Sequence, residues 1–198
     1  MPDPTTMLAL KALAAFLMGS IPFAVLAMMG SGVDIRTVGS GNPGFNNVLR
    51  VSKPRAFFCL AGDLGKGILA ILLLSTVSDP IGVRWTIAFA VMLGHCYSPW
   101  LRFNGGKGVA TSSGVMLMLY PWLALPCGIT YLAGRVVGKK MRWRESGAMA
   151  SLGGWALFVV LLLATEGERT ALYGAIMLAI VTWRHKDNLQ RLFQPAQA

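Results

Sequence analysis

Apolar residues occupy most of the chain in long runs, and short polar stretches separate them. A helix needs about 20 mostly apolar residues to cross a bilayer, with about 17 as the usual lower limit. Several runs reach that length, so the pattern predicts an all-α integral membrane protein. The runs lie at residues 6–29, 55–77, 83–101, 109–120, 121–137, 148–165 and 170–183.

The stretch 109–137 is too long for one straight span and short for two, and "YPW" at 120–122 and Pro126 interrupt it. Cytoplasmic loops carry an excess of Lys and Arg. Two crossings put the densest basic cluster on the same side as most other basic residues. That cluster is Arg135, Lys139, Lys140, Arg142 and Arg144. We therefore expect one compact domain over 1–198 with about seven transmembrane helices, the N-terminus outside and the C-terminus cytoplasmic. The two central helices are short or partly re-entrant.

The composition agrees with lipid as the main solvent. Apolar residues make up 55% of the chain and charged residues 13%, against about 25% charged in soluble domains. The net charge of +10 suggests nucleic acid for a soluble domain, but the apolar runs favour a membrane protein beside anionic lipid. Membrane lipid, and not nucleic acid, is the expected partner.

The three cysteines, Cys59, Cys96 and Cys127, lie singly in apolar stretches, and no C-x-x-C occurs. We interpret them as small buried hydrophobic residues. The first apolar run has Asp3 before it and Lys11 inside it, and it lacks a basic n-region. We therefore expect a retained span and not a cleaved signal.

The stretch "GSGNPG" at 39–44 fits the dinucleotide fingerprint G-x-G-x-x-G. That fingerprint needs a preceding strand, whereas an apolar run of membrane length precedes this loop and Pro43 lies inside it. Glycines allow positive φ, and N–H groups in such a turn can bind an anion. Polar donors here are Arg36, Ser40, Asn42, Asn46, Asn47 and Arg50. An ordinary solvated turn is the alternative.

A second glycine-rich stretch, "LRFNGGKGVATSSG", lies at 101–114. It departs from a Walker A loop because Leu101 takes the first Gly position and Gly108 follows Lys107 where Ser or Thr is required. What remains is a turn with a Lys that leads into a helix start carrying Thr111. Free N–H groups at a helix start attract phosphate. The alternative is a basic cytoplasmic turn.

Further polar residues lie at other helix ends. Asp63 and Lys66 in "GDLGKG" share a helix face, which suits an ion pair or a site. Ser146 in "RWRESG" suits a helix cap or a site. The stretch "WRHKDNLQRLF" suits an amphipathic tail or a site. His95 is expected to be a hydrogen-bonded core residue, and two distant histidines with few carboxylates favour no metal site.

All of these stretches lie on the cytoplasmic face in the expected topology. The ligand is therefore expected to be anionic at one end and either lipidic or transported. A transporter for a phosphorylated metabolite is an alternative, because broken central helices can aim their N-termini at an anion. The clustering at one face and the lack of a repeat count against it. A structural membrane subunit explains the glycine-rich loops poorly.

Five stretches in order resemble the acyl-phosphate-dependent glycerol-3-phosphate acyltransferases of bacteria, the PlsY family. "GSIPFA" is similar to the first-span motif of that family, "GSGNPGFNNVLR" to G-S-G-N-x-G-A-T-N-x-L-R, and "GDLGKG" to D-x-x-K-G. "FNGGKGVAT" is similar to F-x-G-G-K-G-V-A-T, and "RHKDNLQRL" to R-H-x-x-N-x-x-R-L. Phe45-Asn46 replaces the usual Ala-Thr, which removes a hydroxyl. "FQPAQA" stands where Gly-Thr-Glu often follows, so no role of that Glu is carried over.

The resemblance implies transfer of a fatty acyl group from acyl phosphate to the sn-1 hydroxyl of glycerol 3-phosphate, at the cytoplasmic face of the bacterial inner membrane. It implies no metal or cofactor, and a soluble phosphate acyltransferase as a supplier of acyl phosphate. The implied catalytic residues are Ser40, Arg50, Lys107, His185 and Asn188. The implied substrate-binding residues are Gly39, Gly41, Asn42, Gly44, Asn47, Gly105, Gly106, Thr111 and Ser146. The base is His185 or a substrate phosphate oxygen, with a lean towards the substrate.

Overall fold

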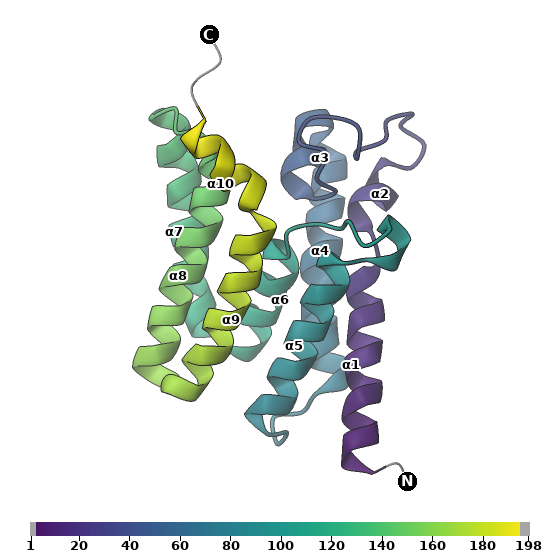
Figure 1. The fold of residues 1–198 in the computed structure, drawn as a ribbon, viewed down its shortest axis with the longest axis vertical. Coiled ribbons are helices and arrows are strands. Elements are labelled where there is room, and N and C mark those ends of the chain that lie inside the picture. The colour runs from purple at the N-terminus through teal and green to yellow at the C-terminus, as the bar shows by residue number, and fades with distance from the viewer. Residues whose placement is uncertain (1–2, 195–198) are drawn as a thin grey trace. The chain divides into compact units, whose positions relative to one another are not determined.

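The computed structural model describes residues 3–194, and the last four residues of "FQPAQA" lie outside that range. The chain divides into two compact units, Met1–Leu119 and Tyr120–Ala198. Within the described residues the regular structure is helical, which confirms the all-α class (Figure 1). The single domain over 1–198 stays a prediction.

The first unit contains six α-helices and one 3-10 turn among its described residues. They are α1 (Pro4–Ser20), α2 (Phe23–Met28), α3 (Phe45–Val51), α4 (Lys53–Leu74), α5 (Ile81–Cys96), η1 (Pro99–Leu101) and α6 (Val109–Leu119). The second unit contains α7 (Pro121–Lys140), α8 (Ser146–Glu166), α9 (Glu168–Arg184) and α10 (Lys186–Phe193).

Helices cover all seven apolar runs, and prolines explain where the expected and observed ends differ. The run at 6–29 breaks at Pro22, which separates α1 from α2. The run at 83–101 ends as an α-helix at Cys96, and Pro99 begins the 3-10 turn. The stretch 109–137 forms two helices, as expected, because Pro121 stands at the start of α7, where its missing N–H costs nothing.

Among residues 3–194, three helical segments are long and apolar enough to cross a membrane. They are Pro4–Met28, Lys53–Leu74 and Ser146–Glu166. Helix α6 has only 11 residues, or about 16 Å at 1.5 Å per residue, against an apolar bilayer core of about 30 Å. The count of seven crossings and the sides of the two termini stay predictions.

Glycines let two helix pairs of the first unit meet backbone to backbone. A Cβ on Gly19 of α1 would clash with the carbonyl oxygen of Val91 in α5, and a Cβ on Gly94 of α5 would clash with Phe16 in α1. Gly67 in α4 and Gly114 in α6 stand in the same reciprocal relation, against the carbonyls of Thr111 and Leu64. Small residues are the usual means of close helix packing in lipid, where no hydrophobic force drives helices together.

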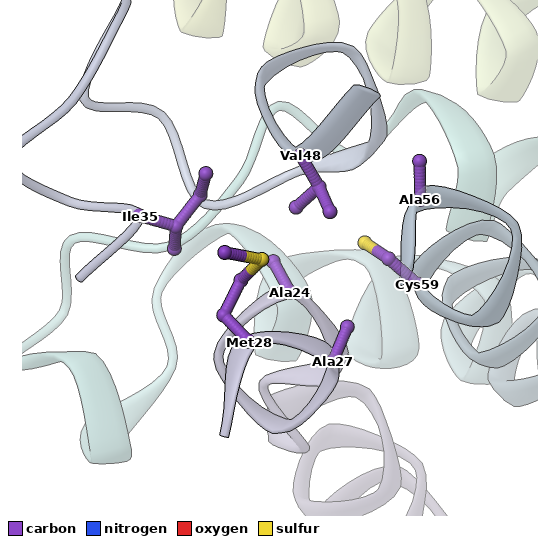
Figure 2. Close-up of a cluster of buried hydrophobic side chains, with 7 residues drawn as sticks. All are labelled: Ala24, Ala27, Met28, Ile35, Val48, Ala56 and Cys59. Atoms are coloured by element: carbon purple, nitrogen blue, oxygen red, sulfur yellow. The ribbon is translucent and has the colours of Figure 1, made fainter. Parts of the chain in front are cut away.

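A small apolar core fixes the polar segment between α2 and α3 to the bundle (Figure 2). Its buried members are Ala24, Ala27, Met28, Ile35, Val48, Ala56 and Cys59. Ile35 comes from the polar segment itself, whereas Val48 comes from α3 and Cys59 from α4. The loop is therefore held by buried side chains, although much of its own surface is exposed.

The second unit packs α7 against α8 and α8 against α9. Its buried aromatic contact joins Phe158 edge-on to Trp155 and to Tyr120, with ring centroids 5.4 Å and 6.0 Å apart. Cys127 is buried in α7, and Cys59 and Cys96 are buried in the first unit, all with free thiols. The expected burial of the three cysteines is confirmed, but the Cys59 thiol also donates to Asp63 Oδ2 at 3.5 Å and is therefore not purely apolar in its contacts.

Candidate functional site

The loop at 39–47 has the backbone geometry that its glycines predict. Gly39 and Gly41 have φ of 58° and 66°, a region that side chains disfavour. A Cβ on Gly39 would also clash with the side-chain oxygen of Asn47. Gly39 is therefore required both for the turn and for the close approach of Asn47.

Asn47 holds this loop from inside. Its side chain is buried, and its Nδ2 donates to the carbonyl oxygens of Ile35 and Val38 at 2.9 Å and 3.0 Å. Its Oδ1 accepts from the N–H of Ser40 at 3.1 Å. Both amide protons and the amide oxygen are thus engaged within the loop, which places the exposed Ser40 relative to α3.

Three backbone N–H groups of the expected anion nest are engaged within this loop. The N–H of Ser40 is bonded to Asn47, that of Gly41 donates to Val38, and that of Gly44 donates to Asn42. The positive φ values close the turn on its own acceptors and leave these donors inside it. Anion binding by this loop stays a prediction, and its polar side chains are the donors not used in these three bonds.

Two arginines of this region differ in their partners. Arg36 forms a forked pair with Asp34, with Nη2 2.7 Å from Oδ2 and Nε 2.9 Å from Oδ1. This hydrogen bonding lowers the pKa of Asp34 to about 2. Arg50 is exposed, and its Nη1 lies against Gly39 beside Ser40 in the chain. Arg50 is thus the guanidinium placed at the glycine turn.

The second glycine-rich turn is fixed to the end of α5. The N–H of Gly105 donates to Cys96 and that of Gly106 to His95, at 3.0 Å and 3.1 Å. These two N–H groups therefore satisfy carbonyls at the end of α5, and the expected substrate-binding role of Gly105 and Gly106 stays a prediction. The turn carries Lys107 directly before Gly108 and the start of α6.

Thr111 lies in the first turn of α6 and is fully buried. Its hydroxyl has no hydrogen-bond partner among the described residues. A buried hydroxyl without a partner costs about 1–3 kcal/mol. Such a group, four residues after Lys107, is a candidate contact for a polar ligand.

A buried ionic group lies next to this turn, where His95 contacts Gly106. It consists of Asp63, Lys66 and His95 and is here called the Asp63 network. Asp63 Oδ1 is 2.9 Å from Lys66 Nζ and 3.3 Å from His95 Nδ1. Lys66 Nζ also donates to the carbonyl oxygen of Ile21 at 3.0 Å. The expected pair of Asp63 and Lys66 is confirmed, and His95 is the polar core residue that its sequence context predicts.

In the second unit, His185 and Asn188 are both buried, at the junction of α9 and α10. His185 Nδ1 lies 2.8 Å from the carbonyl oxygen of Val181. A carbonyl only accepts, so this contact favours the tautomer with the proton on Nδ1 and the acceptor lone pair on Nε2. His185 therefore has a fixed ring orientation.

Asn188 belongs to a group that sequence reasoning missed, here called the Glu145 cluster. Asn188 Nδ2 donates to one carboxylate oxygen of Glu145, and Arg191 Nε donates to the other. The bond to Glu145 raises the pKa of the Arg191 guanidinium. One signal was available: Glu145 is a lone carboxylate within the densest basic stretch.

Ser146 follows Glu145 and lines a basic pocket of about 480 Å³ at the end of α7. Arg135, Lys139, Arg142 and Trp143 also line it. Three cations beside a hydroxyl suit an anionic group. Over residues 3–194 no group of three or more His, Cys, Asp or Glu side chains is placed to hold a metal ion.

Comparison with known proteins shows which protein family this chain resembles. The glycerol-3-phosphate acyltransferase family model matches residues 9–195. A glycerol-3-phosphate acyltransferase of Methylobacillus flagellatus is 39% identical over 188 residues, which are 94% of this chain and 93% of the relative. One of Burkholderia ambifaria (strain MC40-6) is 40% identical over 186 residues, which are 92% of this chain and 86% of the relative.

The fold is also similar to that of PlsY (YgiH), an integral membrane glycerol 3-phosphate acyltransferase. The crystal structure of its glycerol 3-phosphate form has a TM-score of 0.79 and 30% identity, and covers 93% of this chain and 91% of that chain. The lysophosphatidic acid form has a TM-score of 0.77 and 28% identity over the same shares.

Proposed function

Because the chain belongs to the glycerol-3-phosphate acyltransferase family, we propose that it acylates the sn-1 hydroxyl of glycerol 3-phosphate with acyl phosphate as donor. The hydroxyl oxygen forms a bond to the acyl carbonyl carbon, and the bond from that carbon to the phosphate oxygen breaks. The hydroxyl proton leaves with the phosphate. The products are 1-acyl-glycerol 3-phosphate and inorganic phosphate.

The observation that carries this proposal is the turn of Lys107, which two backbone hydrogen bonds attach to α5 and which leads directly into α6. Lys107 supplies a positive charge for a phosphate group, and the buried hydroxyl of Thr111 supplies a polar contact. Gly105 and Gly106 act by allowing the turn to lie against His95. A mixed anhydride needs no prior activation, so positioning two phosphates and stabilising an oxyanion account for the catalysis.

In the first loop we assign Ser40, Asn42 and Arg50 to phosphate binding and polarisation of the acyl carbonyl. Asn47 and the glycines Gly39, Gly41 and Gly44 then act by shaping the loop, because the amide of Asn47 is engaged with Ile35, Val38 and Ser40. This assignment replaces direct substrate contact for Asn47 by a positioning role.

In the second unit we assign His185 and Asn188 to the attacking hydroxyl, and Ser146 with its basic pocket to an anionic substrate group. The proton acceptor is His185 Nε2 or a substrate phosphate oxygen, and we favour the substrate. If His185→Gln lost as much activity as Lys107→Ala while still binding glycerol 3-phosphate, the base would be His185.

The reaction is proposed to occur at the cytoplasmic face of the bacterial inner membrane. Glycerol 3-phosphate is a soluble anion, whereas acyl phosphate carries a long apolar chain that a bundle of lipid-embedded helices can accommodate. A soluble phosphate acyltransferase is the class of enzyme that would supply the donor.

The test uses purified protein in detergent with glycerol 3-phosphate and either palmitoyl phosphate or palmitoyl-CoA. Phosphate release and lipid product are followed. We expect turnover with palmitoyl phosphate alone, and a loss of about 100-fold or more in Lys107→Ala, the scale of removing one oxyanion donor. Lys140→Ala removes an exposed cation at the end of α7 and is the matched control.

Turnover with palmitoyl-CoA alone would reject the donor. No turnover with either donor, together with uptake of labelled glycerol 3-phosphate into proteoliposomes, would favour a transporter.

A further inference from the structure

The Asp63 network is a costly arrangement for a membrane helix bundle. Asp63, Lys66 and His95 are 2%, 4% and 7% exposed. Ionisable groups inside transmembrane segments are rare and usually have a functional reason. Lys66 Nζ and His95 Nδ1 both face one oxygen of Asp63. The network joins α4 to the last turn of α5.

His95 contacts the Lys107 turn on its other side. A Cβ on Gly106 would clash with His95 Nε2, so the backbone of Gly106 lies directly against that edge of the imidazole. The N–H of Gly106 also donates to the His95 carbonyl at 3.1 Å. The imidazole thus stands between the buried carboxylate of Asp63 and the residue that precedes Lys107.

We propose that His95, oriented by Asp63, is a positioning residue that sets the place of Lys107. The inference rests on the proposed role of Lys107 in phosphate binding. Asp63 only accepts hydrogen bonds when ionised, so its 3.3 Å contact with Nδ1 favours a proton on that nitrogen. The ring packs against the backbone of Gly106. Lys66 Nζ donates to the Ile21 carbonyl and keeps Asp63 in place.

Helix stabilisation alone is the competing account of this network. A buried ion pair need not stabilise a fold, but removing one partner destabilises it whatever its role in the reaction. Activity of single variants therefore does not separate the two accounts. A double-mutant cycle does, because residues that act through one another give non-additive effects.

The cycle combines His95→Asn with Lys107→Arg. Asn keeps an N–H donor for Asp63 but removes the ring edge that supports Gly106. We measure kcat/KM for glycerol 3-phosphate with palmitoyl phosphate, and the Kd for glycerol 3-phosphate by calorimetry in case turnover falls below detection. We expect His95→Asn to cost about tenfold in the parent and less than about twofold beside Lys107→Arg, a coupling typical of contacting residues.

Asn104→Ala, an exposed change in the same loop, is the control and should be additive with Lys107→Arg. If His95→Asn fails to fold, Asp63→Asn takes its place in the cycle with the same expectation. An equal loss in both Lys107 backgrounds, or no loss from His95→Asn, would overturn the positioning role and leave the proposed function standing. Parent-like binding and turnover in both Lys107→Arg and Lys107→Ala would instead reject the proposed site.

Discussion

The Asp63 network and the Glu145 cluster are built from similar chemistry in different surroundings. Each joins a carboxylate to a cation and to a third polar side chain. The side chains of Asp63 and Lys66 are 3% exposed, whereas those of Glu145 and Arg191 are 21% and 41% exposed. The first group lies inside a helix bundle, and the second lies where helices end.

This difference changes what each group can do. In a buried site a lost partner leaves a charge without solvent, so removing one partner of a buried pair costs about 3–5 kcal/mol. In the partly exposed Glu145 cluster water can reach Glu145 and Arg191 and replace part of a lost contact, and fully exposed pairs contribute only about 0–1 kcal/mol. The Asp63 network can therefore fix the geometry of a turn, whereas the Glu145 cluster can bias the rotamer of Asn188 without deciding stability.

The largest expected effect comes from the close backbone packing of α4 against α6, which begins one residue after Lys66. Gly67→Ala places a methyl group against the carbonyl oxygen of Thr111, so α4 and α6 must separate. We expect a loss of about 3 kcal/mol in the free energy of unfolding, at the upper end for overpacking, because backbone must move. Chemical unfolding in detergent micelles measures it. Gly65→Ala, where nothing lies within 4 Å of the added Cβ, should be neutral or slightly stabilising.

The next largest effect is expected from Asn47→Ala in the first loop. The change leaves two carbonyls and one N–H without partners in a partly buried segment. We expect a loss of about 2 kcal/mol in stability, and about 100-fold in kcat/KM because Ser40 and Arg50 shift. Asn46→Ala, at an exposed position, should leave unfolding unchanged. Parent-like turnover in a folded Asn47→Ala protein would contradict the positioning role.

A smaller effect is expected from Glu145→Gln. The amide keeps the shape of the side chain but weakens the contacts with Asn188 and Arg191. We expect about 0.5 kcal/mol or less in stability, as for exposed pairs. Turnover should fall about threefold, equivalent to about 0.7 kcal/mol, through misplacement of Asn188. Glu168→Gln, at the start of α9, is the matched control. A loss of several kcal/mol would show that the Glu145 cluster behaves like a buried one.

Local patterns predicted the helices and the turns of this fold well. Apolar run length and Pro22, Pro99 and Pro121 account for the helix ends, because those effects act within a few residues. Gly39 and Gly41 adopt the positive φ that glycine-rich turns suggest. The Asp63–Lys66 pair is also a local feature, three residues apart on one helix.

Long-range partners could not be predicted in the same way. The hydrogen bond between Glu145 and Asn188 joins residues 43 positions apart. The glycine crossing of α4 and α6 depends on helix register, which no single run encodes. The N–H groups of Gly105 and Gly106 look available in sequence, but the fold places α5 carbonyls next to them. The sequence thus identified candidate site residues. It did not indicate which of them would contact a ligand and which would position other residues.

The smallest expected effect concerns the exposed pair of Asp34 and Arg36. This pair adds a surface ion pair to the comparison of the two groups. Hydrogen bonds from Arg36 lower the pKa of Asp34 to about 2. A lowered pKa in the folded state means that the pair contributes above the ordinary carboxylate pKa, about 3.9, and is lost as pH falls towards 2. Carbon-13 NMR of the labelled Asp34 carboxyl should give this midpoint, and Arg36→Gln should raise it towards the ordinary range, because only the backbone hydrogen bond from residue 36 remains. Because water screens the pair, activity and unfolding near neutral pH should be the same in both proteins. An unshifted midpoint in the parent would mean that the pair is not held in solution, and the contrast with the Asp63 network would then be larger than the structure implies.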